Sequence, residues 1–229
     1  MAALEARLDE IRARVASACA RAGRDQSSVA ILPVTKSVAI GRLRAALAAG
    51  LTTFAENRVQ EAELKVAALP DAHWQLVGHL QSNKAHRALA LFDVVHSLDS
   101  LDLAQRLDRL TREAGRPPLP VFVQVNIDRD PAKMGMRPEE VEAALPQLAE
   151  LAGLELRGLM TVGRLVARAE EARPTFAALR SLSERLRVSQ PALGAGLSMG
   201  MSDDFEVAID EGATVVRIGR ALFGDRPGG

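Results

Sequence analysis

Lysine is scarce in this chain, and one lysine stands at the end of a predicted strand, where an amine could act as a nucleophile. The sequence has twenty-five arginines but only four lysines, Lys36, Lys65, Lys84 and Lys133. Lys36 closes the apolar run 29–35. Partial burial lowers the pKa of a lysine amine and frees it to attack a carbonyl, whereas an arginine stays charged. The competing interpretation of Lys36 is a surface lysine whose amine extends into solvent.

A second group of residues, near the C-terminus, has the composition of an anion site. Segment 198–202, Ser-Met-Gly-Met-Ser, combines small residues, hydroxyls and a glycine, so several backbone N–H groups can turn toward one anion. Arg217-Ile-Gly219 stands at the end of the next predicted strand, 214–218. Alone, either motif is explained by a tight turn or by an arginine capping a helix. Together, opposite a lysine, they favour a phosphorylated aldehyde such as pyridoxal 5'-phosphate (PLP) as ligand.

The elements between these motifs alternate between short apolar strands and helices. Strands are predicted at 29–35, 52–55, 73–77, 93–96, 120–126, 154–160, 195–199 and 214–218. Each is followed by a predicted helix, at 39–49, 57–68, 83–91, 100–114, 138–151, 170–188, 203–211 and 220–223. Eight such units favour a (β/α)8 TIM barrel, an α/β fold in which the strands' carboxyl ends meet at one mouth.

An additional amphipathic helix is predicted over 2–22, ahead of the first strand. The last predicted helix, 220–223, is too short to cover its strand, so we expect the N-terminal helix to complete the ring. An open doubly wound sheet is the rival fold, because 194–200 superficially resembles a dinucleotide loop. Its glycines are spaced G-x-G-x-x-x-G rather than G-x-G-x-x-G, which disfavours that fold. No linker divides the chain, so we expect a single domain over 1–229.

Composition excludes several functional classes. The formal net charge is zero and 25% of residues are charged, which gives no sign of a nucleic-acid surface. No apolar run approaches the ~20 residues of a transmembrane helix, and the acidic N-terminus is unlike a signal peptide. The single cysteine, Cys19, is predicted to fill the core, and the four histidines lack metal-ligand spacing. We therefore expect a cytoplasmic protein without a metal or membrane partner. No exposed apolar stripe beyond ordinary barrel helices demands a dimer, so we also expect a monomer.

Segments spanning nearly the whole chain resemble the PLP-binding homeostasis proteins of the YggS/PROSC type. The matching segments are Val-Thr-Lys at 34–36, Phe-Ala-Glu-Asn-Arg-Val-Gln-Glu at 54–61, Gly-His-Leu-Gln-Ser-Asn-Lys at 78–84, His-Ser-Leu-Asp at 96–99, Val-Asn-Ile at 125–127 with Lys133 and Gly135, Gly-Leu-Met-Thr at 158–161, Ser-Met-Gly-Met-Ser-Asp-Asp at 198–204 and Val-Arg-Ile-Gly at 216–219, leading to Phe-Gly at 223–224. The resemblance implies the PLP barrel of the alanine racemase N-terminal-domain type.

The resemblance also implies roles for individual residues. Lys36 would carry PLP as a Schiff base, Asn57 would line the pocket, and Arg217 would face the pyridine nitrogen. The implied phosphate cup comprises Ser198, Gly200, Met201, Ser202, Gly219 and Arg220, the last two mainly through backbone N–H groups. Two positions depart from the family pattern. The family usually has glycine where Ala55 stands, which bears on how closely the backbone can approach a ligand there. It often has Ser or Thr at position 220, so the hydroxyl contact that those residues can make to the phosphate is not expected from Arg220.

Two functional hypotheses follow, and a third remains open. The chain has no tyrosine, so a racemase that uses a lysine and a tyrosine as its two bases is excluded. An arginine facing the ring nitrogen also weakens PLP as an electron sink. The leading hypothesis is a PLP carrier without dedicated turnover, which passes the cofactor to apo PLP-dependent enzymes, with Lys84 or Lys133 as a second amine. The alternatives are a racemase or lyase with a non-tyrosine base, and a barrel that binds a phosphorylated sugar.

Overall fold

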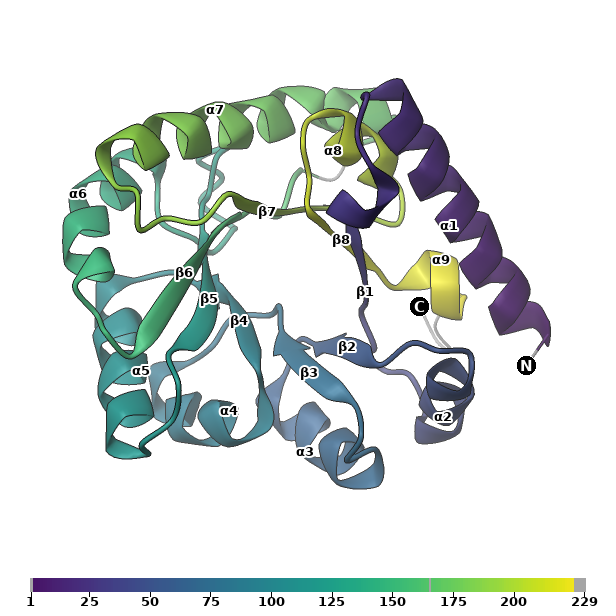
Figure 1. The fold of residues 1–229 in the computed structure, drawn as a ribbon, viewed down its shortest axis with the longest axis horizontal. Coiled ribbons are helices and arrows are strands. Elements are labelled where there is room, and N and C mark those ends of the chain that lie inside the picture. Colours follow the sequence, from purple (N-terminus) through teal and green to yellow (C-terminus); the bar gives the residue numbers. More distant parts are fainter. Residues whose placement is uncertain (1, 165, 225–229) are drawn as a thin grey trace.

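A ring of eight parallel strands forms the centre of the computed structural model, which describes residues 2–164 and 166–224 (Figure 1). The strands are β1 (Ala30–Pro33), β2 (Thr53–Glu56), β3 (His73–Leu76), β4 (Val94–Leu98), β5 (Leu119–Gln124), β6 (Leu154–Met160), β7 (Gly196–Met201) and β8 (Val215–Ile218). Strands that are consecutive in sequence are neighbours from β2 to β8, and β8 pairs with β1. The predicted α/β barrel is therefore confirmed, and the rival open sheet is wrong.

The ring closes between β1 and β2 through a short seam. Val34 and Ala55 form an isolated parallel bridge, and the Thr35 N–H donates to the Ala55 carbonyl at 2.8 Å. The other strand pairs share longer registers, such as Ala30 to Pro33 against Val215 to Ile218. Lys36 follows this seam directly, so the closure of the barrel and the position of the lysine depend on the same few residues.

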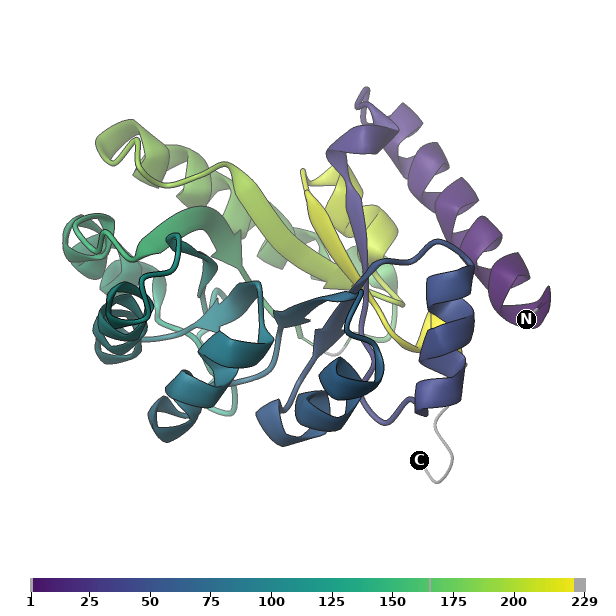
Figure 2. The same ribbon diagram turned by 60° about the horizontal axis from the view of Figure 1, so that its bottom comes forward.

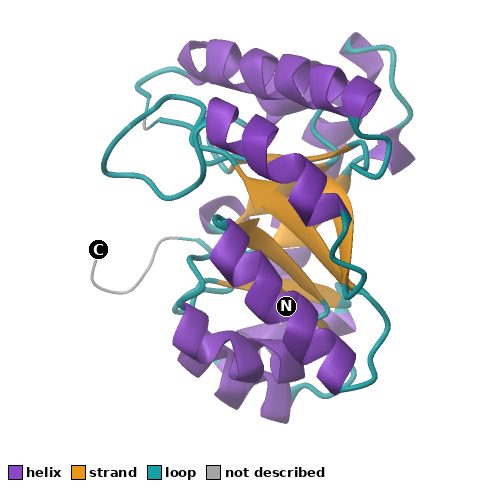
Figure 3. Cartoon of the chain, turned by 90° about the vertical axis from the view of Figure 1, so that its left-hand side faces the viewer, coloured by secondary structure: helices purple, strands orange, loops and turns teal. Residues whose placement is uncertain are grey.

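Helices enclose the ring on its outside (Figure 3). They are α1 (Ala2–Arg21), α2 (Ile40–Ala48), α3 (Val59–Ala68), α4 (Ala85–Leu91), α5 (Leu101–Glu113), α6 (Pro138–Ala149), α7 (Arg173–Ser189), α8 (Phe205–Asp210) and α9 (Arg220–Phe223). Local chemistry explains several starts: the Ser100 hydroxyl accepts the Leu103 N–H ahead of α5, and Pro138 opens α6. The predicted helices at 83–91 and 170–188 each begin with a 3-10 turn, at Ser82–Lys84 and Ala169–Ala172.

Helix α1 lies against α8 and α9, beside the last strands of the ring (Figures 1 and 2). Its apolar stripe, including Leu8, Ile11 and Cys19, is buried. Arg14 also reaches from α1 to Glu206, with Nη2 and Oε2 2.9 Å apart. Because α9 has only four residues, α1 supplies the apolar surface that a full eighth helix would provide.

The interior of the ring differs from the layer between strands and helices. That layer is apolar, whereas inside the ring only a small apolar cluster forms, with Leu32, Ala55 and Val77 at its centre. Polar side chains from β3, β4, β7 and β8 bond to one another across the interior. The barrel thus has a polar interior directly beneath its mouth.

Candidate functional site

Lys36 lies in a turn that follows β1 at the closing seam of the barrel. The residue is half-buried, and Ser37 beside it has φ +62°, a left-handed conformation that is uncommon for a residue other than glycine. Among the residues that the structure describes, none forms a hydrogen bond or ion pair with the Lys36 amine. The amine is therefore not committed to the protein and is available to a ligand.

Charged side chains beneath this turn form a group that we call the Lys65 clamp: Glu56, Glu61 and Lys65. The Lys65 amine donates to Glu56 Oε1 at 2.5 Å, to Glu61 Oε1 at 2.9 Å and to the Thr35 carbonyl at 2.7 Å. Glu61 Oε1 accepts the Ser37 N–H at 2.5 Å. Burial disfavours the ionised Glu61, yet the bonds from Lys65 and Ser37 outweigh burial and lower its pKa. The clamp thus contacts the backbone on both sides of Lys36.

Asn57 stands where β2 ends, next to the turn that follows β3. Its backbone N–H donates to Glu56 Oε2 at 3.1 Å, but its Oδ1 atom is buried without a hydrogen-bond partner among the described residues. A Cβ atom on Gly78 would lie 2.2 Å from the Asn57 carbonyl oxygen, so only glycine fits there. An unpaired buried oxygen costs free energy, and a ligand that donates to it would remove that cost.

The predicted anion loop, 198–202, comprises the last four residues of β7 and Ser202, and its backbone turns sharply at Gly200. Gly200 has φ +90°, and a Cβ atom there would lie 2.5 Å from the Ala208 Cβ. The Met201 N–H donates to Asp204 Oδ1 at 2.6 Å, and burial raises the pKa of that carboxyl. The Ser202 hydroxyl accepts the Ala221 N–H at 3.2 Å, which joins this loop to α9. The loops after β7 and β8 therefore meet, as the sequence predicts, although Met201 already has a partner for its N–H.

Arg217 is buried inside the barrel at the centre of a hydrogen-bond chain. Its guanidinium donates to the Ser198 carbonyl at 2.7 Å, to the Ser198 hydroxyl at 2.9 Å and to the Thr161 carbonyl at 2.7 Å. His96 joins Ser198 to Gln75, with Nδ1 2.9 Å from Ser198 Oγ and Nε2 2.7 Å from Gln75 Oε1. The chain is satisfied when His96 donates through Nε2 and accepts the Ser198 hydroxyl proton at Nδ1.

Within this hydrogen-bonded group, Arg217 carries the positive charge and His96 is neutral. Burial lowers the pKa of His96 to about 3, and the nearby Arg217 charge acts in the same direction. Burial also lowers the pKa of Arg217 to about 10, while Asp204 opposes that shift. His96 stacks on Phe122, with ring centroids 4.5 Å apart. At neutral pH the barrel interior beneath the mouth therefore contains a charged Arg217 and a neutral His96.

The other predicted residues lie around the mouth in different surroundings. Gly219 sits between β8 and α9, and the side chain of Arg220 pairs with the exposed Asp203 at 2.5 Å. The amine of Lys133 donates to the carbonyls of Val162 and Gly163, at 3.2 and 2.6 Å, which ties two loops together. The hydroxyl of Ser198 hydrogen-bonds to Arg217 and His96, so both of its partners lie inside the barrel.

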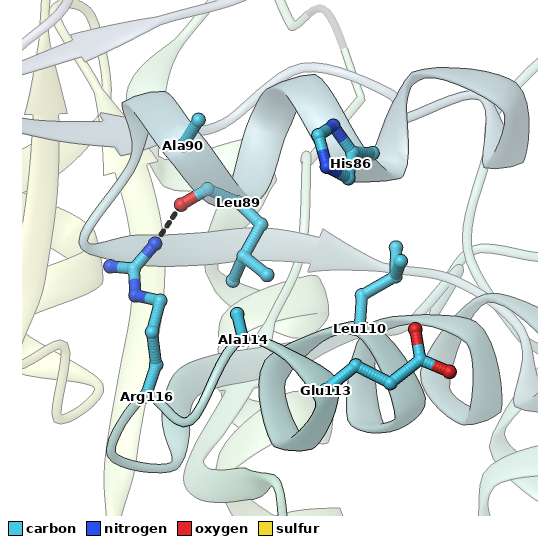
Figure 4. A pocket seen from close by; sticks show the side chains of 7 residues that line it. All are labelled: His86, Leu89, Ala90, Leu110, Glu113, Ala114 and Arg116. Atoms are coloured by element: carbon cyan, nitrogen blue, oxygen red, sulfur yellow. Dashed lines mark hydrogen bonds between the residues drawn. The ribbon is translucent and has the colours of Figure 1, made fainter.

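The described residues line one cavity away from this site and another that adjoins it. One of about 350 Å³ lies between α4 and α5, lined by Leu89, Leu110 and Arg116 among others, and Arg116 donates to the Leu89 carbonyl (Figure 4). Its lining comes from α4, from the last turn of α5 and from the residues that follow α5. Another, also of about 350 Å³, adjoins the anion loop from the α1 side and is lined by Arg7, Arg14 and Ser202 among others.

Three residues of the site, Glu61, Lys65 and Gln75, were missed in the sequence. Lys65 stands mid-helix and follows no strand, and Gln75 points into the barrel from within β3. The scarcity of lysine and the spacing of Glu61 and Lys65, four residues apart on one helix, were the available signals for the clamp. Within residues 2–164 and 166–224, no group of three or more His, Cys, Asp and Glu side chains is placed to hold a metal ion, and no helix could span a membrane.

Comparisons with known proteins agree with this geometry. Residues 6–227 match the family model of the alanine racemase N-terminal domain. The pyridoxal phosphate homeostasis protein of Pseudomonas aeruginosa is 42% identical over 228 residues, covering 99% of this chain and 97% of that protein. The protein of the same name from Aquifex aeolicus is 38% identical, covering 96% of this chain and 97% of the relative.

Solved structures show the same barrel. PipY of Synechococcus elongatus PCC7942, solved with PLP bound, has a TM-score of 0.85 and 40% identity, over 96% of this chain and all of PipY. An alanine racemase of Clostridium difficile 630 has a TM-score of 0.76 at 17% identity. This chain spans 57% of that racemase, so the likeness to it shows the fold alone.

Proposed function

This chain belongs to the pyridoxal phosphate homeostasis protein family, and we propose that it holds PLP on Lys36 as a store of the cofactor rather than as a catalyst. The observation that carries this proposal is the Lys36 amine, which has no partner among the described residues and follows β1, the strand that pairs with β8 beside the anion loop. PLP supplies an aldehyde, whose carbon forms a C=N bond to a lysine nitrogen while its oxygen leaves as water. This linkage is reversible, which suits both capture and release.

The residues around Lys36 suit the remaining groups of the cofactor. We assign the phosphate to the loop residues Ser198, Gly200, Met201 and Ser202 and to the backbone of Gly219 and Arg220. Gly200 supports this assignment, because only glycine fits its conformation and its contact with Ala208. The unpaired Asn57 Oδ1 supports a ligand contact at the second strand.

We assign Arg217 to the ring nitrogen. Arg217 stays charged at neutral pH, since its pKa remains near 10 despite burial. A guanidinium cannot give up its proton to a pyridine nitrogen, so the ring stays a weak electron sink. The chain also has no tyrosine to serve as a second base. Both features favour storage of PLP over turnover of an amino acid.

The test of this proposal is where PLP becomes attached. Reduction with borohydride should fix PLP on Lys36, as read by peptide mass spectrometry, and Lys36→Ala should abolish the visible absorbance of the bound cofactor. Lys36→Arg is the matched control, because it keeps the positive charge but cannot form the C=N bond. A label found mainly on Lys84 or Lys133 would refute the assignment.

A screen of amino acids for turnover distinguishes the carrier from the alternative, a PLP-dependent racemase or lyase. A carrier should show no turnover with any amino acid beyond slow background, whereas an enzyme should reach about 1 per second or more, the low end of ordinary kcat values. The third possibility, a phosphorylated-sugar binder, predicts that Lys36→Arg leaves binding intact.

We further propose that the protein is a cytoplasmic monomer that delivers PLP to apo PLP-dependent enzymes. Support for a monomer is the scatter of large exposed apolar side chains: Leu64 lies on α3, Val188 on α7 and Met134 in a loop after β5. Scattered apolar residues do not form the continuous patch of a stable interface. Sedimentation at micromolar concentration checks the monomeric state. Activation of a recipient apoenzyme by the PLP-loaded protein checks delivery.

A further inference from the structure

We propose that the Lys65 clamp positions Lys36 for the capture of PLP. This inference rests on the proposed function and adds three residues, Glu56, Glu61 and Lys65, that act through the turn bearing Lys36. None of them needs to touch the cofactor.

The first step of the argument is the backbone of the turn. Ser37 adopts φ +62°, which is disfavoured for a serine and persists only when its surroundings hold it. Glu61 accepts the Ser37 N–H at 2.5 Å, and Lys65 donates to the Thr35 carbonyl at 2.7 Å. The residues immediately before and after Lys36 are thus fixed by two charged side chains, which leaves Lys36 little freedom in its backbone direction.

The second step is the cost of burial. Lys65 is 5% exposed and Glu56 is fully buried. Buried ion pairs are often no more stabilising than well-packed apolar side chains of the same volume. Charged groups whose bonds end on the backbone flanking Lys36 therefore point to a positional role, because apolar side chains could fill the space but could not bind Thr35 and Ser37.

The third step is the closure of the barrel at the same place. The Thr35 hydroxyl donates to Glu56 Oε1 at 2.5 Å, and is also 3.0 Å from the Ala55 carbonyl. Glu56 Oε2 accepts the Asn57 N–H at 3.1 Å. The clamp therefore joins the Lys36 turn to Asn57 through Glu56, so that the backbones of two residues assigned to the pocket are linked.

The experiment compares Glu61→Ala with Glu63→Ala. Glu61 is part of the clamp, whereas Glu63 lies on the same helix and pairs with Arg87 away from it. Each variant loses one ion pair of α3, and the two glutamate side chains are similarly exposed, 27% for Glu61 and 34% for Glu63. The first readout is hydrogen exchange of the Ser37 amide in the protein without PLP, which should become at least about tenfold faster in Glu61→Ala, as loss of a charge-assisted hydrogen bond predicts.

The second readout is the rate at which the visible absorbance of bound PLP develops. In Glu61→Ala the rate at saturating PLP should fall about tenfold, for the same lost bond, while the PLP concentration for half-maximal rate stays unchanged. Glu63→Ala should match the unaltered protein in both readouts. Glu61→Gln should restore part of the rate, because its amide oxygen can still accept the Ser37 N–H.

Equal exchange and equal rates in Glu61→Ala and Glu63→Ala would overturn the inference. A fall in the melting temperature of Glu61→Ala with an unchanged saturating rate would also overturn it, because the clamp would then be purely structural. If Glu61→Ala does not fold, Glu61→Gln and Glu63→Gln replace the pair, with a smaller expected loss. Failure of the unaltered protein to label at Lys36 would instead refute the proposed function.

Discussion

The two cationic side chains nearest the predicted chemistry, Lys36 and Arg217, have opposite surroundings. Lys36 has no protein partner among the described residues, whereas Arg217 makes three hydrogen bonds to Ser198 and Thr161. A free amine can exchange ligands, while a buried and fully held guanidinium is a fixed charge. This contrast is what a reversible cofactor store requires of the two groups.

A pH dependence of stability follows from His96. Its pKa falls from 6.5 to about 3 on folding, because burial disfavours the charged ring. The unfolded chain therefore binds the proton first, so stability is complete above pH 6.5 and declines as pH falls toward 3. The free energy of unfolding should drop by up to about 1.4 kcal/mol per pH unit in this window.

The measurement is urea unfolding at pH 7, 6 and 5, a range in which few carboxylates titrate. His96→Gln should remove most of the slope, since glutamine keeps hydrogen-bonding groups but has no titrating ring. An equal slope in His96→Gln would assign the dependence to another group.

At the scale of single elements, α1 behaves as part of the barrel rather than as an appendage. Leu8, 1% exposed, lies in the buried stripe of α1, and that helix contacts α8 and α9. Leu8→Ala should lower the free energy of unfolding by about 2–5 kcal/mol, the range for deleting a buried leucine side chain.

Arg12→Ala, on the exposed face of the same helix, is the control and should stay within about 0.5 kcal/mol. Thermal or urea unfolding of both variants checks this. A Leu8→Ala variant as stable as Arg12→Ala would mean that α1 does not contribute to the core.

At the scale of the whole molecule, we predict that residues 1–229 unfold as one domain. The single tryptophan, Trp74, is buried on β3 and packs against Phe54 with ring centroids 5.5 Å apart. Its fluorescence reports on the first half of the ring, while far-UV circular dichroism reports on all helices. The two urea transitions should coincide, as they do for a two-state unit, and separated midpoints would indicate two domains.

The order of strands and helices followed from the sequence because hydrophobic periodicity and capping residues are local signals. The positions of Lys36, the anion loop and Arg217 at or near strand ends followed as well, since all strand ends of a parallel barrel meet at one mouth. The absence of tyrosine constrained the chemistry without any structure.

Tertiary structure alone decided which side chains meet. Lys65 reaches from α3 to Glu56 and to the Thr35 carbonyl, thirty positions away in the chain, and His96 bonds to Ser198 across 102 positions. No local pattern encodes such contacts, because they depend on how the ring closes and on the rotamer each side chain adopts once buried. The sequence pointed to Lys36 as the candidate amine, and only the folded barrel revealed the clamp beneath it.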